Sequence, residues 1–181
     1  MAIVQAPIVS PTHVMRSVEI EDAQQILDLR LDESLNKFLN TTDPSITSQQ
    51  AWISTQRDTP NDYYFGLIAN GASNPEGFVG LYNIDARTGE WGRWVFAKSA
   101  TSAALSARLV IEFGFSLGLE KIECNTLIGN TAVVAWHDRL PYSQRIEDER
   151  FVKHSILVSE SAEFLNCLQK LVDRQTKKLL Q

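Results

Sequence analysis

The stretch WVFAKSATSAA, residues 94–104, decides the fold, because an aromatic-rich strand passes through small residues directly into a helix. Apolar residues recur every four positions after it and predict a helix over residues 102–117. Strands are expected on both sides of this helix, at residues 90–98 and 121–128. A strand, a helix and a strand in this order place the two strands near each other and parallel.

The rest of the chain alternates between strand and helix patterns around this unit. Further strands are expected at residues 14–20, 63–69, 77–85 and 151–158, and further helices after residue 20 and at 47–57, 130–140 and 160–180. Turn residues separate the three central strands, which favours an antiparallel meander. The sequence therefore predicts an α/β fold with a mixed, mostly antiparallel sheet that contains one parallel pair.

The composition is that of an ordinary globular domain, with 44% apolar and 22% charged residues among 181. We expect one domain over residues 1–158, to which a C-terminal helix at residues 159–181 also belongs. A protein with a net charge of −5 does not attract the negatively charged phosphate backbone of a nucleic acid, so no nucleic-acid partner is expected.

Metal and membrane chemistry are also not expected from the residue pattern. The two cysteines and three scattered histidines show no metal-ligand spacing, so no metal is predicted. No signal peptide and no membrane-spanning apolar run is recognised, which favours a cytoplasmic protein without a membrane partner.

The turn before residues 102–117 has the features of an anion site. A helix N-terminus presents unpaired N–H groups and a positive dipole end, and small side chains let a phosphate approach them. Lys98 adds a positive charge beside this turn. A plain strand-to-helix turn with serine and threonine caps is the alternative interpretation.

His137 is a candidate functional residue next to the short apolar face of Val133, Trp136 and Leu140. We expect it at the edge of a cleft below the parallel strands, where an imidazole changes protonation near neutral pH. The alternative is a partly buried histidine that is hydrogen-bonded to the backbone.

These features resemble the GNAT superfamily of acetyl-CoA-dependent N-acetyltransferases over residues 14–158. Lys98-x-x-Thr101-x-Ala103 stands where the family has a Gln/Arg-x-x-Gly-x-Gly/Ala turn, and Asn130 matches the family asparagine. His137 occupies the place of the tyrosine that usually protonates the leaving thiolate. The resemblance implies a GNAT-like sheet with helices on both faces and a splayed parallel strand pair.

The resemblance also implies the chemistry of the site. Acetyl-CoA is the implied co-substrate, His137 the acid and Glu90 the base that takes a proton from the substrate ammonium. The residues implied in acetyl-CoA binding are Phe96, Ala97, Lys98, Ala100, Thr101, Ser102, Ala103, Asn130 and Arg139. Neither glycine of the family turn is present, so a non-catalytic CoA-binding protein stays an alternative.

Five stretches narrow the resemblance to acetyltransferases that act on nucleotide-linked amino sugars: LRLDES at 29–34, SQQAWI at 48–53, DYYF at 62–65, GLYNID at 80–85 and GEWG at 89–92. They imply a small-molecule primary amine as the acceptor. Arg30, Arg93 and Trp94 are its implied contacts, because arginines form charge-assisted hydrogen bonds with a diphosphate. N-terminal acetylation of a protein is the second candidate, since an acidic enzyme attracts basic substrates.

The C-terminal helix carries an apolar stripe of Phe164, Leu168, Leu171 and Val172, beyond the part that resembles the family. Such a stripe has to be buried on the sheet or against a second copy of the chain. Our interpretation favours a homodimer.

Overall fold

The computed structural model describes residues 6–97 and 102–179. Its elements are β1 (Ile8–Val9), β2 (His13–Ser17), α1 (Ala23–Leu31), α2 (Ile46–Asp58), β3 (Tyr63–Ala69), β4 (Gly77–Asp85), β5 (Thr88–Phe96), α3 (Ala103–Ser116), β6 (Lys121–Leu127), α4 (Thr131–His137), β7 (Gln144–Glu147), β8 (Phe151–Leu157) and α5 (Ser161–Leu179).

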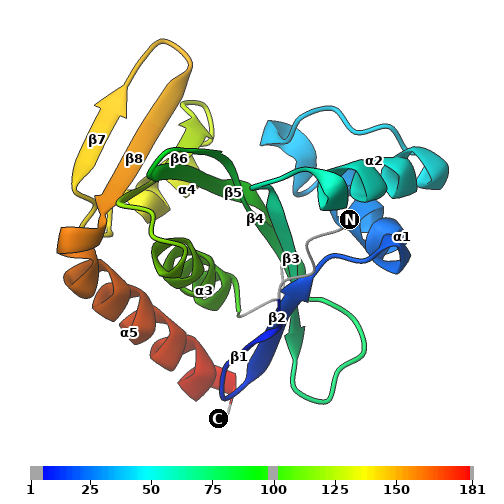
Figure 1. The fold of residues 1–181 in the computed structure, drawn as a ribbon, viewed down its shortest axis with the longest axis horizontal. Helices are drawn as coiled ribbons and strands as arrows, with labels where there is room; N and C mark the ends of the chain where they lie inside the picture. The colour runs from blue at the N-terminus through cyan, green and yellow to red at the C-terminus, as the bar shows by residue number, and fades with distance from the viewer. Residues whose placement is uncertain (1–5, 98–101, 180–181) are drawn as a thin grey trace. The chain divides into compact units, whose positions relative to one another are not determined.

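Hydrogen bonds join the strands into one sheet in the order β1-β2-β3-β4-β5-β6-β8-β7 (Figure 1). The pair β5 and β6 is parallel, whereas β1 with β2, β2 with β3, β6 with β8 and β7 with β8 are antiparallel. The predicted α/β class and the mixed, mostly antiparallel sheet with one parallel pair are confirmed.

The parallel pair is short. Pairing of β5 with β6 joins Thr88–Glu90 to Lys121–Glu123, although β6 continues to Leu127. Further along β5, Arg93 has a positive φ of 48°, which few residues other than glycine adopt in a strand. The extended backbone of β5 is therefore interrupted at Arg93, between Glu90 and the end of the strand.

The chain divides into two compact units. The first, termed the N-terminal unit, comprises residues 1–80 and 93–100, and the second, termed the C-terminal unit, comprises residues 81–92 and 101–181. In the N-terminal unit, α1 and α2 lie side by side (Figure 1). Their buried apolar residues share one core with residues of the strands. This core contains Val18, Ala23, Ile26, Ile53, Tyr64, Phe78 and Val95.

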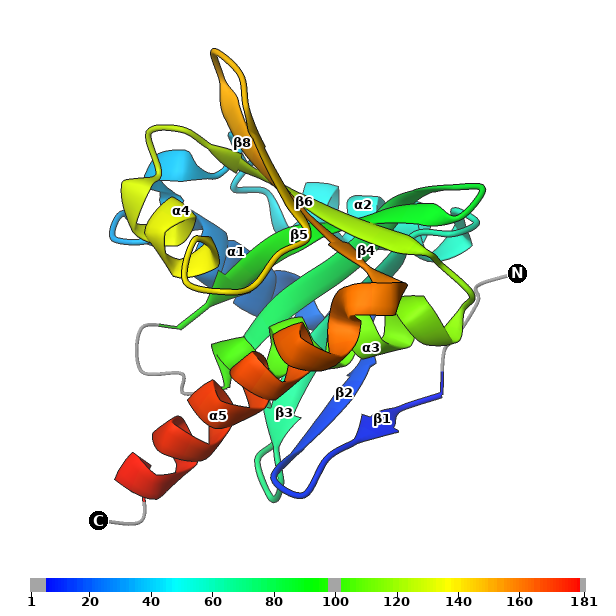
Figure 2. The same ribbon diagram turned by 90° about the vertical axis from the view of Figure 1, so that its left-hand side faces the viewer.

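In the C-terminal unit, α3 and α5 lie side by side (Figure 2). Phe164 and Leu168 of α5 are fully buried, so part of the apolar stripe is covered within the chain itself. Gly118 has a φ of +88° and allows the chain to leave α3 towards β6. A homodimer through the rest of the stripe stays a prediction.

The structure differs from the sequence prediction at three places. Strands β1 and β7 were not expected, since β1 has two residues and all four residues of β7 are exposed. Helix α2 begins after Ser45, whose hydroxyl accepts a hydrogen bond from the Ser48 N–H at 3.3 Å. The helix therefore starts one residue before the predicted start at residue 47. Among the described residues, no helix is long and apolar enough to cross a membrane.

Candidate active site

Glu90 lies on β5 with a half-buried carboxylate that two side chains of β4 hold. The Tyr82 hydroxyl donates a hydrogen bond to Oε1 at 3.2 Å, and the Asn83 amide donates one to Oε2 at 3.0 Å. Gly92 lies under the Tyr82 hydroxyl, which a Cβ at position 92 would overlap. The two donors fix the direction of the carboxylate, which a positioned general base requires.

The N-terminus of α3 is the predicted anion site. Ser102 is buried, alanine follows it at position 103, and the first turn of α3 contains no acidic residue. The first N–H groups of a helix have no partner within the helix, and the first turn of α3 brings no carboxylate of its own that would compete with an anion for them. The predicted contacts Lys98, Ala100 and Thr101 lie outside the described residues.

The end of β5 carries three further predicted residues. Trp94 and Phe96 are half-buried, with ring centroids 6.3 Å apart in an edge-to-face arrangement. The Ala97 N–H donates a hydrogen bond to the Glu76 carbonyl at 3.1 Å. The Ala97 amide is therefore already used by the fold, whereas both aromatic rings keep part of their surface accessible.

Two of the predicted acetyl-CoA contacts flank helix α4: Asn130 precedes it and Arg139 follows it. Asn130 precedes the helix without a side-chain capping hydrogen bond, so its amide is not needed to start α4. Arg139 is exposed, and its Nε donates to the Ala135 carbonyl at 3.1 Å. This hydrogen bond engages one guanidinium nitrogen at the end of α4.

His137 is only 2% exposed, so the expectation that it lies at the edge of a cleft is wrong. Its Nδ1 lies 2.9 Å from the Tyr142 hydroxyl, and its ring packs against Trp91 with centroids 5.6 Å apart. Burial, with a smaller contribution from His154, lowers the pKa of His137 to about 3. The imidazole is therefore neutral at neutral pH and is held by side chains.

A pocket of about 490 Å³ in the N-terminal unit brings together two residues that the sequence predicts as substrate contacts, Arg30 of α1 and Arg93 of β5. Its lining also includes Thr42, Asp43, Ser48, Gln49, Trp52 and Tyr64. Two guanidinium groups, hydroxyls, an amide and aromatic faces therefore meet in one cavity.

The two arginines of this pocket are held differently. The guanidinium of Arg93 donates through Nη1 and Nη2 to the Asp62 carboxylate, at 2.8 Å for the Nη2 bond, and lies over the Trp52 ring at 5.3 Å. Within the described part of the chain, Arg30 donates to neutral groups alone, from Nε to the Thr42 hydroxyl at 2.8 Å and from Nη2 to a backbone carbonyl at 3.1 Å. Arg30 therefore keeps the less compensated charge.

Asp43 is the acidic residue of the pocket lining. Hydrogen bonds from the Ser45 N–H and then the Ser48 hydroxyl lower the pKa of Asp43, so its carboxylate is ionised at neutral pH. An anion in this pocket is attracted by Arg30 and repelled by Asp43.

Several residues at these sites were not predicted as site residues: Asp62, which binds Arg93; Tyr82 and Asn83, which hold Glu90; and Tyr142 and His154, which adjoin His137. The GLYNID stretch drew attention to Tyr82 and Asn83, but only pairing of β4 with β5 reveals their partner. The contact of His154 with His137 depends on the tertiary fold and has no local signal, whereas Tyr142 follows His137 by only five residues.

Comparison with known structures identifies the fold. FdhC, described as a nucleotide-linked sugar GNAT, is 29% identical, with 90% of this chain and 99% of that chain covered and a TM-score of 0.74. A spermidine N-acetyltransferase from Vibrio cholerae, solved with CoA and spermine, is 16% identical over 83% of this chain and 98% of that chain, with a TM-score of 0.70. At that identity the second likeness shows the fold alone.

A comparison with curated proteins finds no match to the chain. A comparison with family models agrees with the structural one. The family model of the acetyltransferase (GNAT) domain matches residues 13–141, which include Glu90, the N-terminus of α3 and α4. GNAT enzymes use acetyl-CoA as the acetyl donor. The chain therefore belongs to the GNAT family of N-acetyltransferases.

Proposed function

We propose that this enzyme acetylates the primary amine of a nucleotide-linked amino sugar. The observation that carries the proposal is the pocket of about 490 Å³ in which Arg30 and Arg93 meet. Guanidinium groups recognise the oxygens of a diphosphate through charge-assisted hydrogen bonds, and Trp52 and Tyr64 offer aromatic faces for a base or sugar. The 29% identity to a nucleotide-linked sugar GNAT supports this acceptor class.

Acetyl-CoA supplies a thioester whose carbonyl carbon an amine can attack. The start of α3 fits its diphosphate, because the first turn combines N–H donors with small residues and no carboxylate. The residues proposed to hold acetyl-CoA are Phe96, Ala97, Lys98, Ala100, Thr101, Ser102, Ala103, Asn130 and Arg139.

Glu90 is the proposed base. An ammonium group has no lone pair with which to attack a carbonyl, so a proton has to leave before or during attack. The carboxylate of Glu90 is oriented by Tyr82 and Asn83 and accepts this proton directly or through water. Trp94, on the same strand, is proposed to contact the acceptor.

His137 does not keep the role of acid in this proposal. A group with a pKa of about 3 carries no imidazolium proton at neutral pH, and a ring that is 2% exposed does not meet the substrate. A thiolate whose conjugate acid has a pKa near 8.5 is a fair leaving group, so departure needs little acid assistance.

Addition of acetyl-CoA should raise the melting temperature. At about 100 times its dissociation constant, the ligand stabilises the fold by about 2.7 kcal/mol, which corresponds to about 5–10 °C for a chain of this size. Differential scanning fluorimetry with acetyl-CoA, and with adenosine as a control that lacks phosphates, measures this shift. No shift at millimolar acetyl-CoA would contradict both catalysis and CoA binding.

Replacing Arg30 with glutamine should raise the KM for the nucleotide sugar about 10-fold or more, because a charged hydrogen bond contributes about 1.5–3 kcal/mol. The KM for acetyl-CoA should not change. The matched control is Asp43→Asn, which keeps the oxygen that accepts the Ser45 N–H but removes the repelling charge, so the same KM should fall. Steady-state kinetics of both variants test the pocket, and an unchanged sugar KM in Arg30→Gln would exclude it as the acceptor site.

A further inference from the structure

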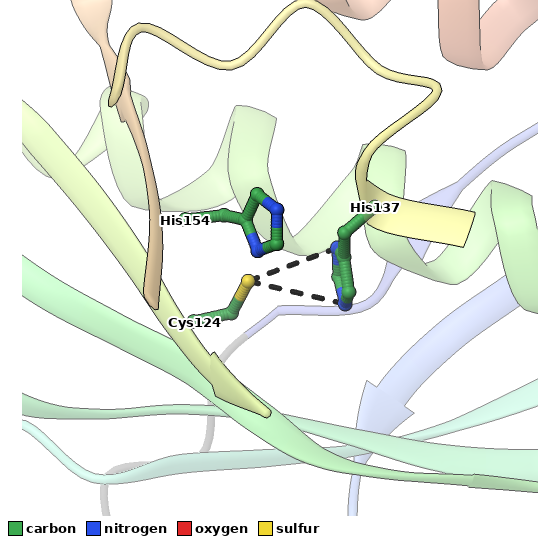
Figure 3. Close-up of side chains that lie close together, drawn as sticks. All are labelled: Cys124, His137 and His154. Atoms are coloured by element: carbon green, nitrogen blue, oxygen red, sulfur yellow. Dashed lines mark hydrogen bonds between the residues drawn. The ribbon is translucent and has the colours of Figure 1, made fainter. Parts of the chain in front are cut away.

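Three potential metal ligands lie together inside the C-terminal unit, outside the residues that carry the proposed reaction. We term Cys124 of β6, His137 at the end of α4 and His154 of β8 the Cys124 cluster (Figure 3). All three are buried, and one ligand atom from each lies within 4.8 Å of the others. Cys124 Sγ is 3.8 Å from His137 Nδ1 and 3.9 Å from its Nε2.

The fold brings these residues together through the sheet. Cys124 and His154 are directly opposite each other in the antiparallel pair of β6 and β8, and α4 places His137 over them (Figure 3). The separations along the chain match no sequence motif for a metal, which explains why the sequence predicted none.

Each histidine of the Cys124 cluster has one ring nitrogen within hydrogen-bond distance of an oxygen atom. His154 Nε2 is 2.8 Å from Asp138 Oδ1, and His137 Nδ1 is 2.9 Å from the Tyr142 hydroxyl. Histidines that bind metals commonly use one nitrogen for the ion and the other for a carboxylate or other oxygen that orients the ring. Asp138 and Tyr142 are in the positions of such orienting partners.

The second nitrogen of His154 points to a missing ligand. His154 Nδ1 is buried and has no hydrogen-bond partner among the described residues, although His154 is only 1% exposed. A buried polar atom without a partner is unfavourable, because it has lost its water and gained nothing in return. A cation between His154 Nδ1, Cys124 Sγ and His137 Nε2 would satisfy it.

The distances admit one ion. Zinc–sulfur and zinc–nitrogen bonds of about 2.3 Å and about 2.0 Å together exceed the 3.9 Å between Cys124 Sγ and His137 Nε2. Cys124 Sγ is almost equally distant from Nδ1 and Nε2 of His137, at 3.8 and 3.9 Å, so binding through Nε2 requires rotation of this ring about its Cβ–Cγ bond. One thiolate and two imidazoles are the donor set that zinc prefers.

We propose that Cys124, His137 and His154 bind one Zn²⁺ ion in a site that fastens α4 to β6 and β8. The Cys124 thiol gives its proton to solvent when the zinc–sulfur bond forms, and both imidazoles bind as neutral ligands. The Tyr142 hydroxyl lies next to these ligands, 3.7 Å from Cys124 Sγ. This site is independent of the proposed acceptor.

The test uses Co²⁺ as a spectroscopic probe for the zinc site. The full chain, stripped with a chelator, is titrated with Co²⁺ and then with Zn²⁺. We expect one equivalent of Co²⁺ to give a thiolate-to-cobalt charge-transfer band and the visible bands of a tetrahedral ion, and Zn²⁺ to abolish both. Absence of these bands in the wild-type chain would overturn the proposal.

Two pairs of variants assign the site. Cys124→Ser should abolish the charge-transfer band, whereas Cys167→Ser, which removes the other cysteine, should keep it.

Asp138→Asn changes an exposed side chain and should weaken Co²⁺ binding about 10–100-fold, as the loss of an orienting partner does. Glu147→Gln, which removes the other carboxylate on Arg145, should leave the affinity unchanged. A band that survives in Cys124→Ser, or equal affinities in Asp138→Asn and wild type, would refute the assignment.

Discussion

Replacing Glu90 with glutamine is expected to lower kcat about 10²-fold or more, the usual contribution of a positioned general base. Glutamine is nearly isosteric and can still accept the hydrogen bond from Tyr82 or Asn83, so the strand should fold as before. The KM for acetyl-CoA should stay within about twofold, because the base acts on the amine. At a pH below the pKa of the substrate amine, most of the amine is protonated. Raising the pH increases the fraction of free amine, which attacks without the help of a base, so part of the lost kcat should return.

The matched control for this variant is Glu123→Gln. Glu123 is the residue of β6 that pairs with Glu90, but its carboxylate lies 2.6 Å from Lys121 Nζ and 3.3 Å from Lys153 Nζ. It is therefore a neighbouring carboxylate already engaged by two lysines, and its replacement should leave kcat nearly unchanged. Equal kcat values for Glu90→Gln and wild type would remove Glu90 from the mechanism.

The elements with a strong local pattern could be predicted from the sequence. The repeat of apolar residues after residue 102 located α3 within one residue at each end, because core-facing positions recur with the helical period. β7 could not be found, since its sequence QRIE has no apolar alternation and it is held only by pairing with β8. The ends of α2 were also predicted within one residue, but its capping residue was not, because several nearby hydroxyls could cap the helix and only the structure shows that Ser45 does.

The candidate site was predictable where a residue type and its position carry the chemistry. Arg30 and Arg93, 63 positions apart, were both singled out, and the structure places both on one pocket. The burial of His137 was not predicted, because Cys124 and His154, which lie beside it, come from strands that only the tertiary fold brings to it. Burial and a nearby histidine, neither visible in the sequence, lower its pKa to about 3.

The measurement that tests the proposed function most directly compares kcat/KM for a nucleotide-linked amino sugar with kcat/KM for the same sugar without its nucleotide. The nucleotide provides remote binding energy that holds the small amine in line with the thioester, so removing it should lower kcat/KM at least about 10²-fold. UMP or dTMP should inhibit by competing with the nucleotide sugar. Equal kcat/KM values for the two sugars, or acetylation of peptides alone, would contradict the assignment of the acceptor.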